Sequence, residues 1–117
     1  MEKNYFQVTN ANIVTNSALR EPQIEAYMEA YNHFVINKEH THAIIVLPTG
    51  CGKSGLISIL PYGIAEGRVL VIAPQLTILD TLEESLDSGS SNNFWIARDV
   101  IKNPNNLPVV VKYEGKD

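Results

Sequence analysis

The sequence predicts an α/β fold, a parallel sheet with helices on both faces, and two observations support it. Short apolar runs that suit buried strands alternate with longer segments in which apolar residues recur every three or four positions, as in amphipathic helices. A Gly-rich loop joins the first of these runs to the following helix. Because strand, helix, strand units form right-handed crossovers between parallel strands, we expect a ligand site at the carboxyl ends of those strands.

The elements follow in order along the chain. Residues 1–18 mix Val, Thr, Asn and Phe without a helical period, and we expect an extended lead-in. From Pro22 the apolar spacing predicts an amphipathic helix that ends near Asn37. The remaining elements are predicted as a strand over 42–47, a helix over 53–60 that breaks before Pro61, a strand over 68–73, a helix over 75–86, a polar loop over 88–93, a short helix over 94–102, a turn over 103–106 and a strand over 107–113.

Length and composition limit the function classes. With 117 residues, of which 44% are hydrophobic and 19% charged, the chain can build one domain or part of one. A net charge of −4 provides no basic field that would hold a nucleic-acid backbone by counterion release. The single cysteine, Cys51, cannot form an internal disulfide, and no apolar run approaches the roughly 20 residues of a membrane-spanning helix. We therefore expect a cytoplasmic protein without membrane contact.

The Gly-rich loop carries the chemistry, and its residues are Pro48, Thr49, Gly50, Cys51, Gly52, Lys53 and Ser54. Gly50 and Gly52 let backbone NH groups approach a triphosphate closely. The Lys53 ammonium can reach the β- and γ-phosphates at the start of the next helix, and the Ser54 hydroxyl can ligate Mg²⁺. The strict pattern asks for Gly at position 47, where this chain has Leu47.

Two other interpretations of reactive residues are weaker. Cys51 could be a catalytic thiol, but no His is placed by the sequence as its base, and the Gly-Lys-Ser context already explains it. His33, His40 and His42 lack the Cys pair or further ligands of a zinc pattern, so we expect surface or helix-end histidines.

The loop resembles motif I of superfamily 2 helicases and translocases, especially the DEAD/DEAH-box branch that includes restriction-enzyme motor subunits. Two further segments match in the right order, and the resemblance covers roughly residues 19–86. The segment 19–23, with Arg20 and Gln23, is similar to the element with which that branch reads adenine, and Gln23 matches the adenine-binding glutamine. The competing interpretation of Gln23 is a polar residue in the first turn of a helix.

The third match resembles motif Ia, which contacts the backbone of a single nucleic-acid strand in that family. It implies a nucleic-acid contact at Pro74, Gln75, Leu76 and Thr77. Gln75 stands where Thr is frequent, and no Arg or Lys follows in the turn, which weakens the electrostatic part of that contact. A plain turn from strand to helix is the alternative.

The resemblance implies that residues 19–117 are the N-terminal portion of a RecA-like P-loop NTPase domain of a helicase or translocase, with ATP and Mg²⁺ as cofactors. DNA rather than RNA is the expected partner, together with remaining motor domains in the same chain. The family hydrolyses ATP with an Asp-Glu pair, which is absent here; Asp87, Asp99 and Glu114 are isolated. We therefore expect a segment truncated before that motif and inactive by itself. An open sheet edge after residue 113 predicts marginal stability or association.

One alternative comes from another class. A small P-loop kinase or nucleotide-binding module would also contain a phosphate loop but would not act on nucleic acid. Leu47 and the element around Gln23 argue against that alternative.

Overall fold

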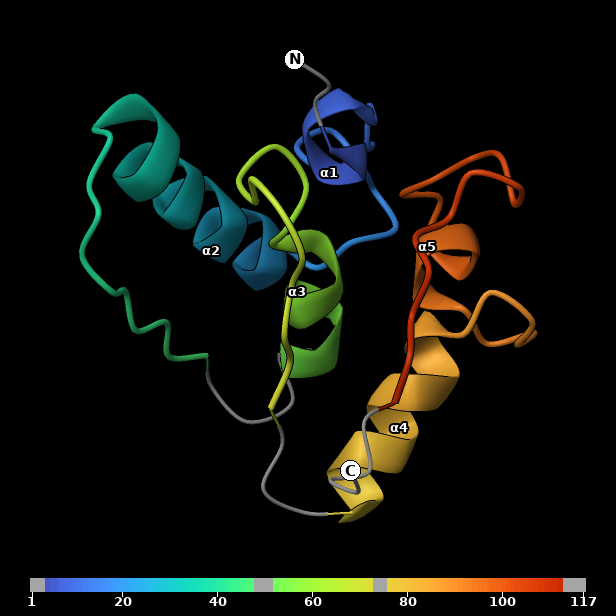
Figure 1. The fold of residues 1–117 in the computed structure, drawn as a ribbon. Coiled ribbons are helices and arrows are strands. Elements are labelled where there is room, and N and C mark those ends of the chain that lie inside the picture. The colour runs from blue at the N-terminus through green and yellow to red at the C-terminus, as the bar shows by residue number, and fades with distance from the viewer. Residues whose placement is uncertain (1–3, 48–51, 73–75, 113–117) are drawn as a thin grey trace.

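The structure is a computed structural model that describes residues 4–47, 52–72 and 76–112. Every regular element in these ranges is a helix (Figure 1). In chain order they are α1 (Tyr5–Val8), α2 (Glu21–Tyr31), the π-helix η1 (Asn32–Ile36), α3 (Lys53–Ile59), α4 (Leu76–Leu86) and α5 (Phe94–Ala97).

Helix α2 confirms the amphipathic helix predicted from Pro22. Pro22 occupies the first turn, where its missing NH costs nothing, and the side chain of Gln23 accepts a hydrogen bond from the backbone NH of Arg20. The buried residues of α2 are spaced by three, one and three positions: Gln23, Ala26, Tyr27 and Ala30. The helix continues without a break into η1, whose end is marked by a 2.8 Å bond from Asn37 N to the carbonyl of Asn32, five residues back.

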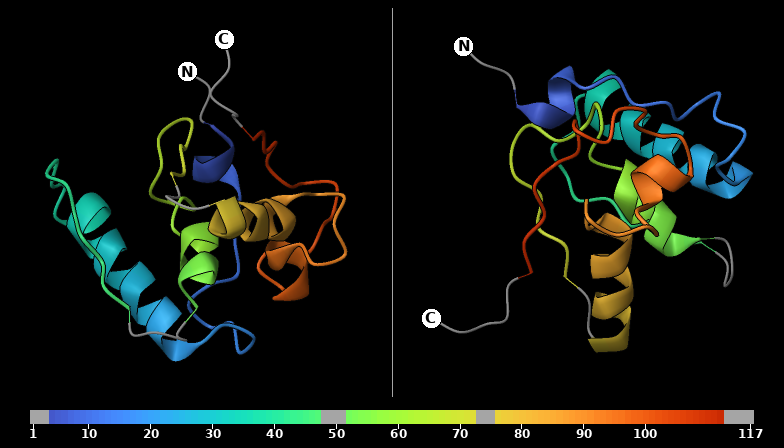
Figure 2. Two further views of the ribbon diagram at one scale, coloured as in Figure 1. Left: turned by 90° about the horizontal axis from the view of Figure 1, so that it is seen from below. Right: turned by 90° about the vertical axis from the view of Figure 1, so that its right-hand side faces the viewer.

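Helix α3 lies at the centre of the packed part of the molecule. It packs against α2 on one side and α5 on the other, as Figure 1 and the left view of Figure 2 show. The helix ends at Ile59, two residues before Pro61, as the sequence predicts. Ile59 is completely buried. Because of this central position, side chains from both α2 and α5 pack against α3.

The predicted parallel sheet is wrong for the part of the chain that the structure describes. The runs 42–47, 68–72 and 107–112 contain no strand, and they extend as open segments in Figures 1 and 2. No backbone hydrogen bond joins one of these described runs to another. A strand exists only when a neighbour completes its ladder, and among the described residues no run has such a neighbour. We refer to the three runs below as the apolar segments.

The apolar segments expose the side chains that a sheet would bury. Ile44 is 91% exposed and Val109 is 93% exposed, whereas Leu47, at the end of the first run, is only 8% exposed. Within 109–111 the exposure alternates, because Val110 is less exposed than its two neighbours. The alternation over these three residues is that of an extended backbone, although no strand pairing accompanies it among the described residues.

The last predicted helix is much shorter than expected. Helix α5 stops at Ala97 instead of reaching residue 102, because Asp99 adopts a left-handed conformation with φ of 57°. The chain then turns back, and the backbone NH groups of Val100 and Ile101 both donate to the carbonyl of Trp95, at 2.8 and 3.1 Å. This turn buries Val100 and Ile101 in the core.

The N-terminal lead-in is folded onto the C-terminal half. It contains α1 where an extended segment was expected, and Ile13 is 4% exposed. The backbone NH of Asn12 donates to the carbonyl of Val100 at 2.9 Å, and the side chain of Asn16 donates to the carbonyl of Arg98 at 2.7 Å. Residues 4–18 are thus part of the packed unit.

Candidate functional site

Gln23 and Gly52 bring two of the predicted site segments together. The side-chain Nε2 of Gln23 donates to the backbone oxygen of Gly52 at 2.9 Å, and its Oε1 accepts from the backbone NH of Arg20 at 2.9 Å. An NH can only donate and a carbonyl can only accept, so these two partners fix which end of the amide is oxygen. Gln23 is 4% exposed, and its amide links the start of α2 to the residue before α3.

Glycine is required where the Gln23 amide meets α3. Gly52 has a φ of +83°, and a Cβ at this position would lie 2.2 Å from the Gln23 nitrogen. A Cβ on Gly55 would lie 2.4 Å from the same nitrogen and 2.8 Å from the Phe94 ring. Both glycines therefore let α2 and α5 approach the first turn of α3 closely.

Gly55 and Phe94 were not among the predicted site residues. A signal for Gly55 was present in the sequence, because a glycine inside a helix costs roughly 1 kcal/mol relative to alanine and so points to a packing need. Phe94 is partly buried, and the Arg98 guanidinium lies 5.9 Å from the centre of its ring. Nothing in the sequence marked Phe94, because its contact with α3 joins residues far apart in the chain.

Lys53 and Ser54 are the first two residues of α3. Lys53 is exposed, while Ser54 is partly buried and its carbonyl accepts a 2.9 Å hydrogen bond from the hydroxyl of Ser58. Arg20 is exposed next to the first residue of α2. The structure thus places Arg20, Gln23, Gly52, Lys53 and Ser54 where α2 and α3 meet. The remaining predicted loop residues, Pro48, Thr49, Gly50 and Cys51, lie outside the described residues.

The predicted nucleic-acid segment is only partly described. Pro74 and Gln75 lie outside the described residues, and Leu76 and Thr77 are the first two residues of α4. Helix α4 packs against α5, which in turn packs against α3. Leu76 and Thr77, the described half of the segment, therefore belong to a helix that α5 connects to α3.

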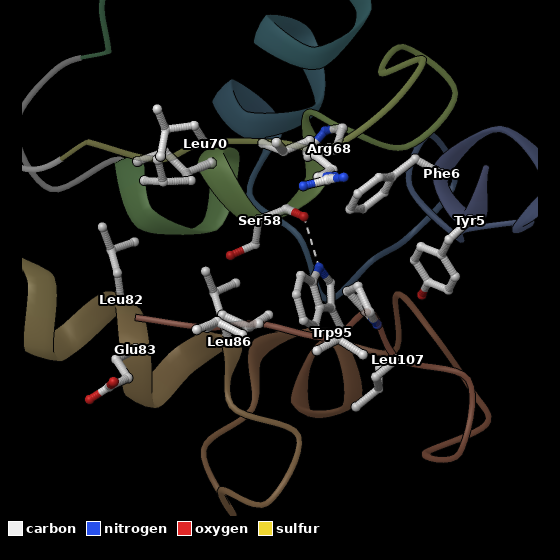
Figure 3. A pocket seen from close by; sticks show the side chains of 18 of the residues that line it. Tyr5, Phe6, Ser58, Arg68, Leu70, Leu82, Glu83, Leu86, Trp95 and Leu107 are labelled. Atoms are coloured by element: carbon white, nitrogen blue, oxygen red, sulfur yellow. Dashed lines mark hydrogen bonds between the residues drawn. The ribbon is translucent and has the colours of Figure 1, made fainter. Parts of the chain in front are cut away.

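An apolar pocket of about 690 Å³ lies apart from these residues (Figure 3). Its walls include Leu70, Leu82, Leu86 and Trp95, with Val109 to Val111 from the last apolar segment. None of the described residues of the predicted site lines it. A triphosphate needs converging NH donors and a cation, which this mainly apolar pocket does not offer.

Three tyrosines form a hydrogen-bonded cluster in the core. Tyr62 is 1% exposed, its hydroxyl lies 3.0 Å from the Tyr5 hydroxyl, and the Tyr27 hydroxyl donates to the Tyr62 carbonyl. Burial, and secondarily the hydrogen bond with Tyr5, raises the pKa of Tyr62 far above its ordinary value, and burial also raises the pKa of Tyr5 and Tyr27. These groups stay protonated at neutral pH and serve packing.

The described residues also bear on metal binding and membrane insertion. Among the described residues, no group of three or more His, Cys, Asp or Glu side chains is placed to hold a metal ion. His33 has its Nε2 3.0 Å from the carbonyl of Thr41. No helix in the described ranges is long and apolar enough to cross a membrane.

A known protein family matches this chain. The family described as type III restriction enzyme, res subunit, matches residues 16–114. No curated protein and no solved structure shows a significant match. The family match includes the Gly-rich loop, the segment around Gln23 and the start of α4, and it spans most of the chain. The chain therefore belongs to the family of the type III restriction enzyme res subunit.

Proposed function

We propose that this chain is the ATP- and Mg²⁺-binding portion of a DNA helicase or translocase motor of the restriction-enzyme kind. The family match supports a motor of this class. The Gly-rich loop supplies the elements that a triphosphate requires, namely small residues, a lysine and a hydroxyl in adjacent positions.

The observation that carries the proposal is the hydrogen bond from Gln23 Nε2 to Gly52 O. It joins two segments, 29 residues apart, that the resemblance assigns to one nucleotide site. Beside it Lys53 is exposed, so its ammonium is available to phosphate oxygens.

Magnesium fits the donor chemistry of this region. Mg²⁺ prefers oxygen ligands and is held by few protein groups together with phosphate oxygens and water. Ser54 provides one hydroxyl directly after Lys53, and it would hold the ion when the triphosphate is bound. The ion would neutralise charge on the phosphates.

The test is binding of Mg-ATP by calorimetry to the chain and to a Lys53→Ala variant. Loss of a charge-assisted hydrogen bond should weaken binding about 10- to 150-fold. Lys102→Ala is the matched control, since Lys102 is also exposed but lies outside the loop. Equal affinity of the Lys53→Ala variant and the parent chain would contradict the proposed site.

Hydrolysis and DNA binding complete the proposal. The 117 residues contain no Asp-Glu pair, so we expect ATP binding without steady turnover. Steady turnover that Lys53→Ala abolishes would contradict this. We assign DNA contact to Pro74, Gln75, Leu76 and Thr77. Since no Lys or Arg follows there, we expect single-stranded DNA to bind weakly and with a shallow salt dependence.

A further inference from the structure

A second pocket, of about 820 Å³, lies between the N-terminal lead-in and the chain that follows α5. Residues 9–15 form one wall, residues between 100 and 106 form the other, and Tyr27, Tyr62 and Gly63 complete the described lining. The volume falls within the roughly 300–1,000 Å³ that is usual for ligand sites. None of the described residues assigned to the nucleotide site lines this pocket.

The two walls are joined by hydrogen bonds. The backbone NH of Asn12 donates to the carbonyl of Val100 at 2.9 Å, and the Nδ2 of Asn12 donates to the carbonyl of Asp99 at 3.2 Å. The Tyr5 hydroxyl donates to the carbonyl of Asn106 at 2.8 Å. Because these bonds fix the walls in the absence of a ligand, binding would require little further ordering of the chain.

The inner lining of the pocket is apolar. Ile13 is 4% exposed, Val100 is 1% exposed and Ile101 is 4% exposed, and all three line the pocket. An apolar side chain of a ligand that reaches these residues would leave water for an apolar surface, which is favourable. The pocket therefore suits a ligand with an apolar end.

The outer lining is polar and carries one charge. Asn10, Lys102 and Asn106 are exposed, and no hydrogen bond joins their side chains to another described residue. An asparagine amide both donates and accepts, so it is complementary to a peptide bond. Lys102 is the only charged residue among the described lining residues. These groups match a peptide backbone that bears a single negative charge.

The aromatic residues of the pocket argue against a nucleotide as its ligand. Proteins that bind unpaired nucleotides stack the bases on accessible aromatic rings. Among the described lining residues the aromatic rings are those of Tyr27 and Tyr62, which are 8% and 1% exposed. Such buried rings offer no surface for stacking, whereas a peptide does not need one.

We propose that this pocket binds the carboxyl-terminal segment of a partner protein that ends in an apolar residue. The terminal side chain contacts the inner lining, Lys102 pairs with the α-carboxylate, and the amides of Asn10 and Asn106 bond to the last peptide groups. This role goes beyond the proposed function and does not depend on nucleotide binding.

The test uses a pool of acetylated tetrapeptides that end in Val, Leu, Ile or Phe, each as the free carboxylate and as the carboxamide. NMR titration of the 117-residue chain should shift the amide signals of Lys102 and Asn103, and the carboxylates should bind about fivefold more tightly than the carboxamides. Equal affinity of the two forms for the parent chain would overturn the role of the carboxylate.

Two variants separate the charge from the amides. Lys102→Met should remove the preference for the carboxylate, whereas Lys38→Met, at an exposed lysine outside the pocket, should keep it. Asn106→Leu should weaken both forms by the same factor, and Asn105→Leu is its control, since Asn105 is exposed in the same turn but does not line the pocket. A Lys102→Met variant that keeps the full preference would contradict the proposal.

Thymidine monophosphate is the competing probe. If it shifts the same amide signals while the peptide pool does not, the pocket binds nucleotides and the proposal fails. If neither probe binds at millimolar concentration, the proposal fails as well. A chain that binds the peptide pool but not Mg-ATP would support this inference and contradict the proposed function.

Discussion

The helices around α3 and the three apolar segments use the same kinds of residues with opposite results. Ile59 in α3 is completely buried, whereas Val109 in the last segment is 93% exposed. The difference is the presence of a partner, because α3 has α2 and α5 against its sides and the described segments have no ladder beside them. Apolar composition therefore stabilises a segment only where another element covers it.

The largest expected contrast compares one core residue with one segment residue. Trp95 is 3% exposed, and its indole donates to the carbonyl of Ser58 at 2.8 Å. Trp95→Ala should lower the free energy of unfolding by about 3–5 kcal/mol, since it leaves a cavity and an unpaired carbonyl. Val109→Ala should change it by less than about 0.5 kcal/mol. Chemical denaturation followed by circular dichroism measures both values, and similar losses would break the comparison.

The next contrast compares two glycines. Gly55→Ala would place a Cβ within 3 Å of Gln23 and Phe94, and the resulting overpacking should cost about 1–3 kcal/mol. Gly67→Ala meets nothing within 4 Å. It should therefore leave the free energy of unfolding unchanged or raise it by a few tenths of a kcal/mol. Thermal melting of both variants checks this, and a Gly55→Ala protein as stable as the parent would contradict the tight contact between α2, α3 and α5.

Alkaline pH should lower the free energy of unfolding, because the tyrosines of the buried cluster lose their protons more readily in the unfolded chain. The folded pKa of Tyr62 is raised above its ordinary 10.0, so below that pH both states are protonated and stability is constant. Above it the unfolded chain loses the proton first, and the free energy of unfolding should fall by up to roughly 1.4 kcal/mol per pH unit for this group. Denaturation between pH 9 and 11 should show this fall, and Tyr62→Phe should flatten it. Identical slopes for the two proteins would exclude Tyr62 as the cause.

The smallest effect on stability is expected in the apolar segments themselves. Val109→Lys and Val111→Lys should change the free energy of unfolding by less than about 0.5 kcal/mol, because both side chains are already exposed. They should nevertheless reduce self-association, which exposed apolar strand-like segments promote. Analytical ultracentrifugation of the double variant and of Ile36→Lys, a control on η1 where the side chain is 62% exposed, measures this. A parent chain that stays monomeric at high concentration would contradict the expectation.

The sequence predicted α2, α3 and α4, but it did not predict α1 or the short length of α5, and the sheet that it predicted is wrong for the described residues. The apolar period and Pro22 predicted the start of α2, and Pro61 predicted the end of α3, because caps and periods are local properties. The formation of a sheet depends on pairing between segments that lie far apart in the chain. The runs at 42–47, 68–72 and 107–112 have the composition of strands, but composition cannot supply a neighbour, and none pairs with them among the described residues.

The candidate site also has a part that could be identified from adjacent residues and a part that depends on contacts between distant segments. Lys53 and Ser54 were identified from adjacent residues, and the structure places them at the start of α3 as the sequence predicts. The contact of Gln23 with Gly52 and the role of Gly55 could not be derived from spacing, because they depend on how closely α2 and α5 approach α3. Residues 48–51 and 73–75 lie outside the described ranges, so the predictions there remain predictions.

The bonds between the lead-in and the C-terminal half have a consequence for biosynthesis. Tyr5 donates to the carbonyl of Asn106, 101 residues later, and Asn16 to that of Arg98, 82 residues later. On a ribosome that adds about 5–20 residues per second, the lead-in would wait roughly 4–20 s for these partners to be made. During that interval the core that includes Ile13 still lacks Val100 and Ile101, so the nascent chain should be most open to chaperones and proteases before Arg98 and Asn106 emerge from the ribosome.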